Sequence, residues 1–171
     1  MREEKYCGKR IDSGEWVYGF LYESEKSSTY NAESFILEKE GLTINYRGDK
    51  GITTYVEFVQ VDPLTVGSNT LIPDINSNTI FEGNIIKATH TFHGNVMEFR
   101  NKPIRSAYGR MIRSGFCYYH RNYVVEYSEK KGAYIARNGS DQYYLMQLVK
   151  YHSAEIIGNI HDNPELLKGG A

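Results

Sequence analysis

The chain has 171 residues, a formal net charge of −1 and a hydrophobic fraction of 40%. These totals describe a globular protein large enough for a real core and exclude a disordered chain. The sequence has no apolar run of about 18 residues, so it predicts no membrane span. The N-terminus lacks the apolar region of a signal peptide. Cys7 and Cys117 are too few for a disulfide framework. We therefore expect a cytoplasmic protein with free thiols and no contact with a membrane.

Strand patterns fill the first half of the chain. Aromatic residues alternate along 15–24, which predicts a core strand. Residues 34–47 predict two short strands joined around Glu40 and Gly41. A further strand over 54–63 ends at Pro63. Residues 65–79 are rich in Gly, Asn, Asp, Ser and Pro and predict a loop.

The second half continues with short strands and turns. The elements predicted there are, in chain order, a strand–turn–strand unit at 79–92, strands at 94–101 and 116–128, a hairpin loop at 129–132, a strand at 133–137, a turn at 138–142, a strand at 154–160 and a helical turn at 163–167. Residues 143–151 fit a short helix as well as a strand, because Leu145, Leu148 and Val149 follow a helical spacing.

Two motifs resemble those of a known family. The first is Ile80-Phe81-Glu82-Gly83-Asn84-Ile85-Ile86, and the second runs from Ile157 to Leu167 as IGNIHDNPELL. Together with residues 5–23 and 61–67, these motifs resemble the YopX family of phage and prophage proteins. The resemblance covers both ends and the middle of the chain.

The resemblance implies a fold and a set of structural residues. It implies a mainly β protein in which an N-terminal β segment (1–60) packs on a small β-barrel-like domain (61–167), with a short helical turn at the C-terminus. Six motif residues are expected to shape turns rather than perform chemistry: Glu82, Gly83, Asn84, Gly158, Asn159 and Pro164. The family usually has Asp where this chain has Asn84, and Asn keeps the turn geometry without the charge.

The second departure from the family is an enlarged insertion at about 88–123. This segment contains six basic residues and a single acid, Glu98, in an otherwise slightly acidic chain. Aromatic residues run through it, and the combination of cations and aromatic rings is typical of surfaces that bind single-stranded nucleic acid. The candidate binding residues are Arg100, Arg105, Arg110, Arg113, Tyr118, Tyr119 and Arg121. The same residue types also occur in protein interfaces, and on a solvated hairpin.

Catalytic and metal chemistry have weak support. His90 and His93, like Cys117 and His120, have a spacing that binds zinc only if the segment is a turn, because on a strand the two members point to opposite faces. The sequence has no nucleophile elbow, phosphate loop or dinucleotide fingerprint. We therefore predict no metal, no cofactor and no catalytic residue.

Three functions stay open. The first is a non-enzymatic phage or prophage accessory protein that acts by protein–protein contact or by self-assembly into a homo-oligomer in the host cytoplasm. The second is binding of single-stranded DNA or RNA by residues 92–123. The third is an enzyme of a type whose motifs are not recognisable. The sequence points to no particular small-molecule ligand.

Overall fold

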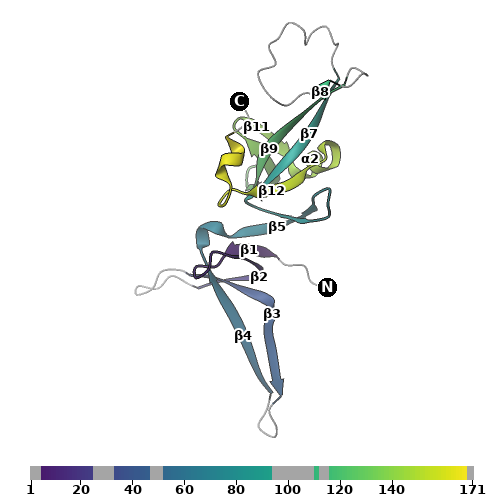
Figure 1. The fold of residues 1–171 in the computed structure, drawn as a ribbon. Helices are drawn as coiled ribbons and strands as arrows, with labels where there is room; N and C mark the ends of the chain where they lie inside the picture. Colours follow the sequence, from purple (N-terminus) through teal and green to yellow (C-terminus); the bar gives the residue numbers. More distant parts are fainter. Residues whose placement is uncertain (1–4, 25–32, 47–51, 94–109, 112–115, 169–171) are drawn as a thin grey trace. The chain divides into compact units, whose positions relative to one another are not determined.

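The computed structural model describes residues 5–24, 33–46, 52–93, 110–111 and 116–168. Over 39–46, 52–57, 91–93, 110–111 and 116–118 it describes the backbone alone. The chain divides into two compact units, residues 1–70 (unit 1) and 71–171 (unit 2). Two antiparallel sheets and one short α-helix make up the described residues (Figure 1). The predicted mainly β fold is confirmed.

The elements follow one another along the chain. The first are β1 (Tyr6–Lys9), β2 (Trp16–Glu23), β3 (Ser34–Tyr46), β4 (Ile52–Val61), the 3-10 helix η2 (Pro63–Thr65), β5 (Gly67–Pro73) and β6 (Thr79–Phe81). The others are β7 (Asn84–His93), β8 (Arg110–Met111), β9 (Phe116–Ser128), β10 (Ala133–Asn138), β11 (Asp141–Tyr144), α2 (Leu145–His152), β12 (Glu155–Asn159) and the 3-10 helix η3 (Pro164–Leu167).

The first sheet has the strand order β4-β3-β2-β1-β5-β6. In unit 1, one face of this sheet carries a small core of Val17, Ile36, Val59 and Val61, all under 8% exposed. Side chains alternate between the faces of a strand. The aromatic residues of β2 therefore lie on the other face, so the strand is confirmed but its aromatic side is not its core side.

The sheet of unit 1 curls until the end of β1 meets the end of β4. Arg10, just after β1, forms a bridge with Val61. The amide of Ile11 donates to the carbonyl of Gln60 at 3.2 Å, and the amide of Asp62 donates to the carbonyl of Lys9 at 2.8 Å. This curl encloses the small core.

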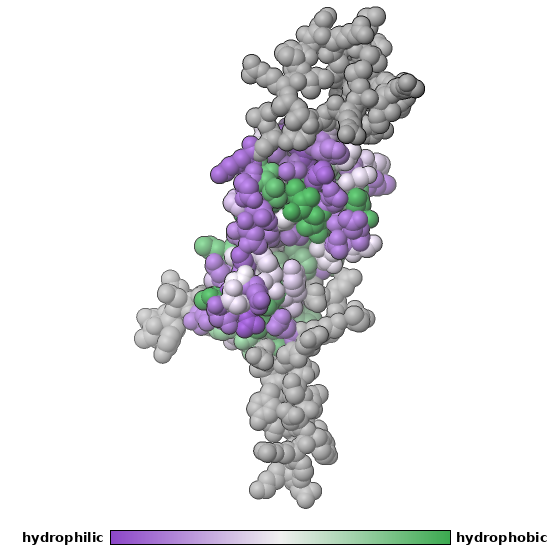
Figure 2. All heavy atoms as spheres, viewed as in Figure 1, coloured by the Kyte–Doolittle hydropathy of each residue, from purple (hydrophilic) through white to green (hydrophobic). Residues whose placement is uncertain are grey.

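The second sheet has the order β11-β10-β9-β7-β12, and β8 pairs with β9. Helix α2 packs on this sheet through Leu145 and Leu148, which are fully buried together with Ile86 and Tyr123. In Figure 2, hydrophilic residues cover much of the visible described surface of unit 2, and a group of hydrophobic residues interrupts them. Among the described strands, β11 and β12 end the order, so the expected barrel is not closed there.

Two local predictions need correction. Residues 34–46 form one strand rather than two, with a register irregularity between Leu37 and Leu42. The predicted loop at 65–79 contains strand β5, and only its end forms the turn. The buried Asp74 carboxylate orders that turn, because it accepts hydrogen bonds from the amides of Asn76 and Asn78, both at 2.8 Å.

Other predictions in unit 2 are confirmed or decided. The ambiguous segment at 143–151 is mostly helix α2, which begins at Leu145 after the short strand β11. The last strand and the C-terminal helical turn occur as β12 and η3. The strand predicted at 94–101 lies outside the described residues. No helix in the described part of the chain has the length and apolar character needed to cross a membrane.

Candidate functional site

The first family motif forms a turn that is fixed by hydrogen bonds on both sides. Gly83 has φ +85°, a conformation that glycine adopts without strain. Its amide donates to the carbonyl of Val125 at 2.8 Å, and its carbonyl accepts from the amide of Ile160 at 2.9 Å. The side-chain oxygen of Asn84 accepts from the amide of Phe81 at 2.8 Å, and Glu82 accepts from the amide of Tyr127 at 3.0 Å.

The second motif surrounds the end of β12. The carbonyl of Asn159 accepts from the amide of Asn163 at 2.8 Å, and its side-chain oxygen accepts from the amide of His161 at 3.0 Å. A side chain on Gly158 would come within 2.6 Å of Asn163 Oδ1. Pro164 begins η3. The motif residues therefore hold the backbone of these turns in shape. Their polar groups form hydrogen bonds within the protein.

The basic aromatic stretch lies only partly within the described residues. Arg100, Arg105 and Arg113 fall outside them. Arg110 and Tyr118 are described by backbone alone and face each other across β8 and β9. Tyr119 and Arg121 are the two candidates whose side chains are described.

The end of this stretch is continuous with the sheet of unit 2. Strands β7 and β9 pair from Ile85 and Val124 out to His93 and Phe116. Residues 88–93 and 116–123, assigned by sequence to an insertion, are thus strand residues of the main sheet. Tyr123 is fully buried within the core. Part of the aromatic content of the stretch therefore supports the fold.

Five aromatic rings gather where this ladder meets the end of α2. His90 stacks on Tyr119 with ring centroids 4.9 Å apart, and its ring lies 4.3 Å from that of His152. Nε2 of His90 is 2.8 Å from the hydroxyl of Tyr123, and the ring of Tyr143 lies 5.4 Å away. We call these five residues the histidine cluster.

Electrostatics keep His90 uncharged near neutral pH. Burial, assisted by His152 and Arg121, lowers the pKa of His90 to about 4. Burial also raises the pKa of the Tyr119 and Tyr123 hydroxyls. An imidazole that stays neutral at pH 7 in this packing acts as a core residue rather than as a proton shuttle.

The neighbouring charges are paired. Arg121 forms an ion pair with Asp141, and Arg137 forms one with Glu126 at 2.7 Å. Arg121 was a candidate for phosphate binding, and its charge is already matched by a carboxylate.

The two spacings considered for zinc lie in strands rather than in turns: His90 and His93 belong to β7, and Cys117 and His120 belong to β9. His90 and His120 occupy successive positions of the β7–β9 ladder, opposite Tyr119 and Thr89, so they lie on opposite faces. Among the described residues, no group of three or more His, Cys, Asp and Glu side chains converges as a metal site requires.

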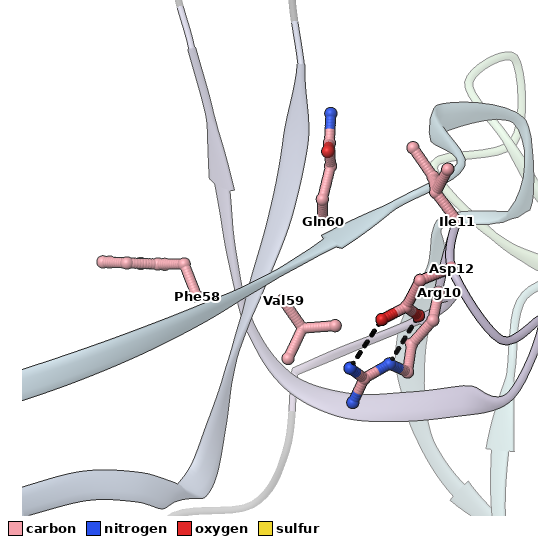
Figure 3. Close-up of a pocket in the computed structure, with 6 residues that line it drawn as sticks. All are labelled: Arg10, Ile11, Asp12, Phe58, Val59 and Gln60. Carbon is pink, nitrogen blue, oxygen red and sulfur yellow. Dashed lines mark hydrogen bonds and ion pairs between the residues drawn. The ribbon is translucent and has the colours of Figure 1, made fainter.

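A shallow pocket of about 230 Å³ lies in unit 1 (Figure 3). Its most polar feature is a bidentate pair in which Arg10 Nε and Nη2 donate to the Asp12 carboxylate at 2.9 and 3.0 Å. The hydrogen bond from Arg10 lowers the pKa of Asp12 to about 2. Asp12 therefore stays ionised and paired, which does not suit it to act as a general acid or base near neutral pH.

Aromatic side chains gather on the outer face of the same sheet. Tyr22 lies 5.6 Å from Phe58 and 6.4 Å from Phe35, measured between ring centroids. Tyr18, Tyr22 and Phe58 remain 41%, 55% and 46% exposed. Phe58 and Val59 project to opposite sides of β4 (Figure 3), consistent with Val59 in the core and Phe58 outside it. We call Tyr18, Tyr22, Phe35 and Phe58 the aromatic face.

The described part of unit 1 carries an excess of negative charge. The described side chains of unit 1 include three cations and six acids. The cations are Lys5, Lys9 and Arg10; the acids are Asp12, Glu15, Glu23, Glu33, Glu38 and Asp62. Arg10 is paired with Asp12, and the ammonium of Lys9 lies over the ring of Trp16 at 5.8 Å. This excess of acids repels a phosphate backbone, but it does not repel a protein surface that carries basic residues.

Sequence reasoning did not single out the aromatic face. The alternation of aromatic residues along 15–24 was visible, but it was interpreted as a core pattern because buried aromatic strands are common. The signal that could have corrected this lies in the alternate positions, where Val17 and Gly19 are small enough for the tightly curled inner side of a sheet.

The fold and the site define a mainly β protein of two units, with hydrogen-bonded turns in its motifs and aromatic residues on one sheet face. The family described as YopX protein matches residues 5–168, and the chain belongs to this family. The predicted resemblance is thereby confirmed.

One solved structure supports the same fold. The crystal structure of protein EF1440 from Enterococcus faecalis is similar to 98% of this chain over 99% of its own length, with a TM-score of 0.53 and 17% sequence identity. At this level of identity the likeness concerns the fold alone. The search of curated proteins gave no match to this chain.

Proposed function

We propose that this protein is a non-enzymatic accessory protein of a phage or prophage, and that it acts by protein–protein contact through the aromatic face of unit 1. The exposure of Tyr18, Tyr22 and Phe58 on one sheet face carries this proposal. Tyr and Phe are enriched at interfaces, and exposed aromatic rings grouped on a rigid sheet supply contact area with little loss of side-chain entropy.

The size of the aromatic face suits a binding surface. Each aromatic side chain offers about 150–250 Å² of area, and roughly half of that remains exposed on three of these rings. Burying it would stabilise a complex by on the order of 5 kcal/mol before the entropic cost of association. A partner that also contacts polar residues of unit 1 would therefore bind with useful affinity.

The charge of unit 1 favours protein over nucleic acid as the partner. Single-strand binding surfaces combine stacking rings with cations that follow the phosphates. The described part of unit 1 has the rings, but its acids outnumber its cations two to one. This excess of acids instead suits a protein partner that presents Lys or Arg beside an apolar patch.

Site-specific photo-crosslinking tests this proposal. A photoreactive phenylalanine analogue replaces Tyr22 or Phe58 in the full chain, produced in a bacterium that carries the phage. Leu64 is the matched control, because it is an 83% exposed apolar residue of the same unit outside the aromatic face. Crosslinked products are then treated separately with protease and with nuclease.

The proposal expects a discrete, protease-sensitive product from positions 22 and 58 and none from position 64. Equal labelling from all three positions would show that the aromatic face has no special role. Products sensitive to nuclease would instead identify nucleic acid as the partner and overturn the protein-contact proposal.

A further inference from the structure

Strand β4 presents a free edge within the described part of the chain. It is the terminal strand of its sheet order, and β3 is its one neighbour in that order. It is ten residues long and contains a single charged residue, Glu57, and no proline. Natural proteins usually shield such an edge with lysine, proline or a bulge, because unpaired backbone groups otherwise recruit another strand.

The backbone pattern shows which groups face the free edge. The Gln60 carbonyl and the Asp62 amide bond with the end of β1, so residues 60 and 62 point their backbone groups away from β3. Backbone direction alternates along a strand, and the register irregularity with β3 lies between Leu37 and Leu42, not in β4. The residues of β4 whose backbone N–H and C=O groups point to the free edge are therefore Ile52, Thr54, Val56 and Phe58.

We propose that the free edge of β4 pairs antiparallel with the same edge of a second copy of this chain, around a twofold axis at Tyr55. This inference goes beyond the proposed function, because it concerns the edge of the sheet rather than the aromatic face and its partner is a second copy of the chain. In an antiparallel pair related by a twofold axis perpendicular to the sheet, residues directly opposite each other must lie on the same face of the sheet. The axis must therefore lie between the two copies of one residue, which are then directly opposite each other.

With the axis at Tyr55, every residue whose backbone groups point to the free edge finds a hydrogen-bonding partner in the second copy. Thr54 then pairs with Val56 of the second copy, and Ile52 pairs with Phe58, so all four residues exchange both backbone hydrogen bonds. An axis at Val56 would leave Ile52 without a partner. An axis at Glu57 would place two carboxylates directly opposite each other, which is destabilising.

The residue types in this register also suit a second copy. With the axis at Tyr55, Glu57 is opposite Thr53 of the other chain, and no like charges meet. The cross-strand pairs join β-branched and aromatic residues, which are the pairs that stabilise antiparallel sheets. The paired edges would also bring the two aromatic faces onto one continuous sheet.

Light scattering coupled to size exclusion tests this pairing with the full chain. We expect wild type to have twice the 19.7 kDa mass of one chain over a wide concentration range. Tyr55→Lys places two ammonium groups opposite each other and should yield a monomer, as should Tyr55→Glu for two carboxylates. An equimolar mixture of the two variants should recover the dimer, which also shows that both variants are folded.

The matched control is Thr43→Lys. Thr43 is the direct partner of Tyr55 across the β3–β4 ladder, so it lies on the same face but on the other strand. We expect Thr43→Lys to remain a dimer. A monomeric wild type, a dimeric Tyr55→Lys, equal loss in Thr43→Lys, or a mixture that stays monomeric would overturn the pairing. A monomeric wild type that still crosslinks a protein at Tyr22 would leave the proposed function standing.

Discussion

The hydroxyl of Tyr123 lies 2.8 Å from Nε2 of His90, and both side chains are buried in unit 2. His90 belongs to β7 and Tyr123 to β9, so the hydrogen bond joins these paired strands through their side chains as well as their backbones. A buried polar pair of this kind stabilises the fold only while both partners are present and uncharged.

The first prediction concerns pH. Burial lowers the pKa of His90 to about 4 from an ordinary value of 6.5. Between these values the unfolded chain binds the proton and the folded chain does not, so the free energy of unfolding decreases as the pH falls from about 6.5 to 4 and levels off below that. Urea unfolding across this range should show a loss of up to about 3 kcal/mol from this group.

His90→Gln provides the comparison for that experiment. Gln does not titrate, so the variant should lose stability less steeply over the same interval. An unchanged slope in the variant would show that other groups cause the acid sensitivity.

The second prediction concerns the hydroxyl of Tyr123. Tyr123→Phe keeps the ring but leaves a buried nitrogen of His90 without this partner, which should cost about 1–3 kcal/mol of unfolding free energy. Tyr127→Phe is the control, because Tyr127 is 47% exposed. Chemical denaturation with an unchanged m-value checks the effect, and equal losses in both variants would refute the special role of this bond.

The third prediction concerns the turn at Asn84. Asn84→Asp restores the residue usual in the family and keeps an oxygen for the amide of Phe81, so stability should change by less than about 0.5 kcal/mol. Asn84→Ala removes that acceptor and should cost about 1 kcal/mol. Thermal unfolding of the two variants side by side measures the difference. A larger loss in the Asp variant than in the Ala variant would show that charge, not the hydrogen bond, governs this position.

The fourth prediction concerns the tight curl of unit 1. A side chain on Gly19 would collide with the carbonyl oxygen of Leu37 on the neighbouring strand. Because backbone cannot move aside without breaking the ladder, Gly19→Ala should destabilise unit 1 by more than about 3 kcal/mol. Gly132→Ala is the control: its Cβ meets nothing within 4 Å, and its φ of +59° adds only about 1–2 kcal/mol of strain. Chemical denaturation of both variants measures the two losses, and comparable values would contradict the collision.

Local pattern predicted most of the strands, the hairpin loop that ends at Gly132 and the C-terminal helical turn, because each depends on residues close in sequence. Strand β5 was missed, since its Gly, Ser, Asn and Pro composition is typical of loops and its strand conformation comes from pairing with β1. The sequence left open whether Tyr123 faces the core, because its burial depends on α2, which lies roughly twenty residues further along the chain.

The candidate site shows a similar division. The motif turns could be expected from Gly83 and Asn84 alone, because their backbone preferences are local. The sequence could not show which side of β2 faces the core. Tyr18 and Val17 are both good strand residues, and the direction in which the sheet curls determines which of the two is buried.

The hydrogen bonds between Lys9–Ile11 and Gln60–Asp62 have a consequence for synthesis. They close a loop of roughly fifty residues, so the end of β1 meets the end of β4 only after most of unit 1 has been made. On the ribosome, β1 and β2 can pair early, but the curl waits until β4 leaves the exit tunnel. A pause in translation placed before residue 62 should therefore hold the nascent unit 1 as an open, unfinished sheet.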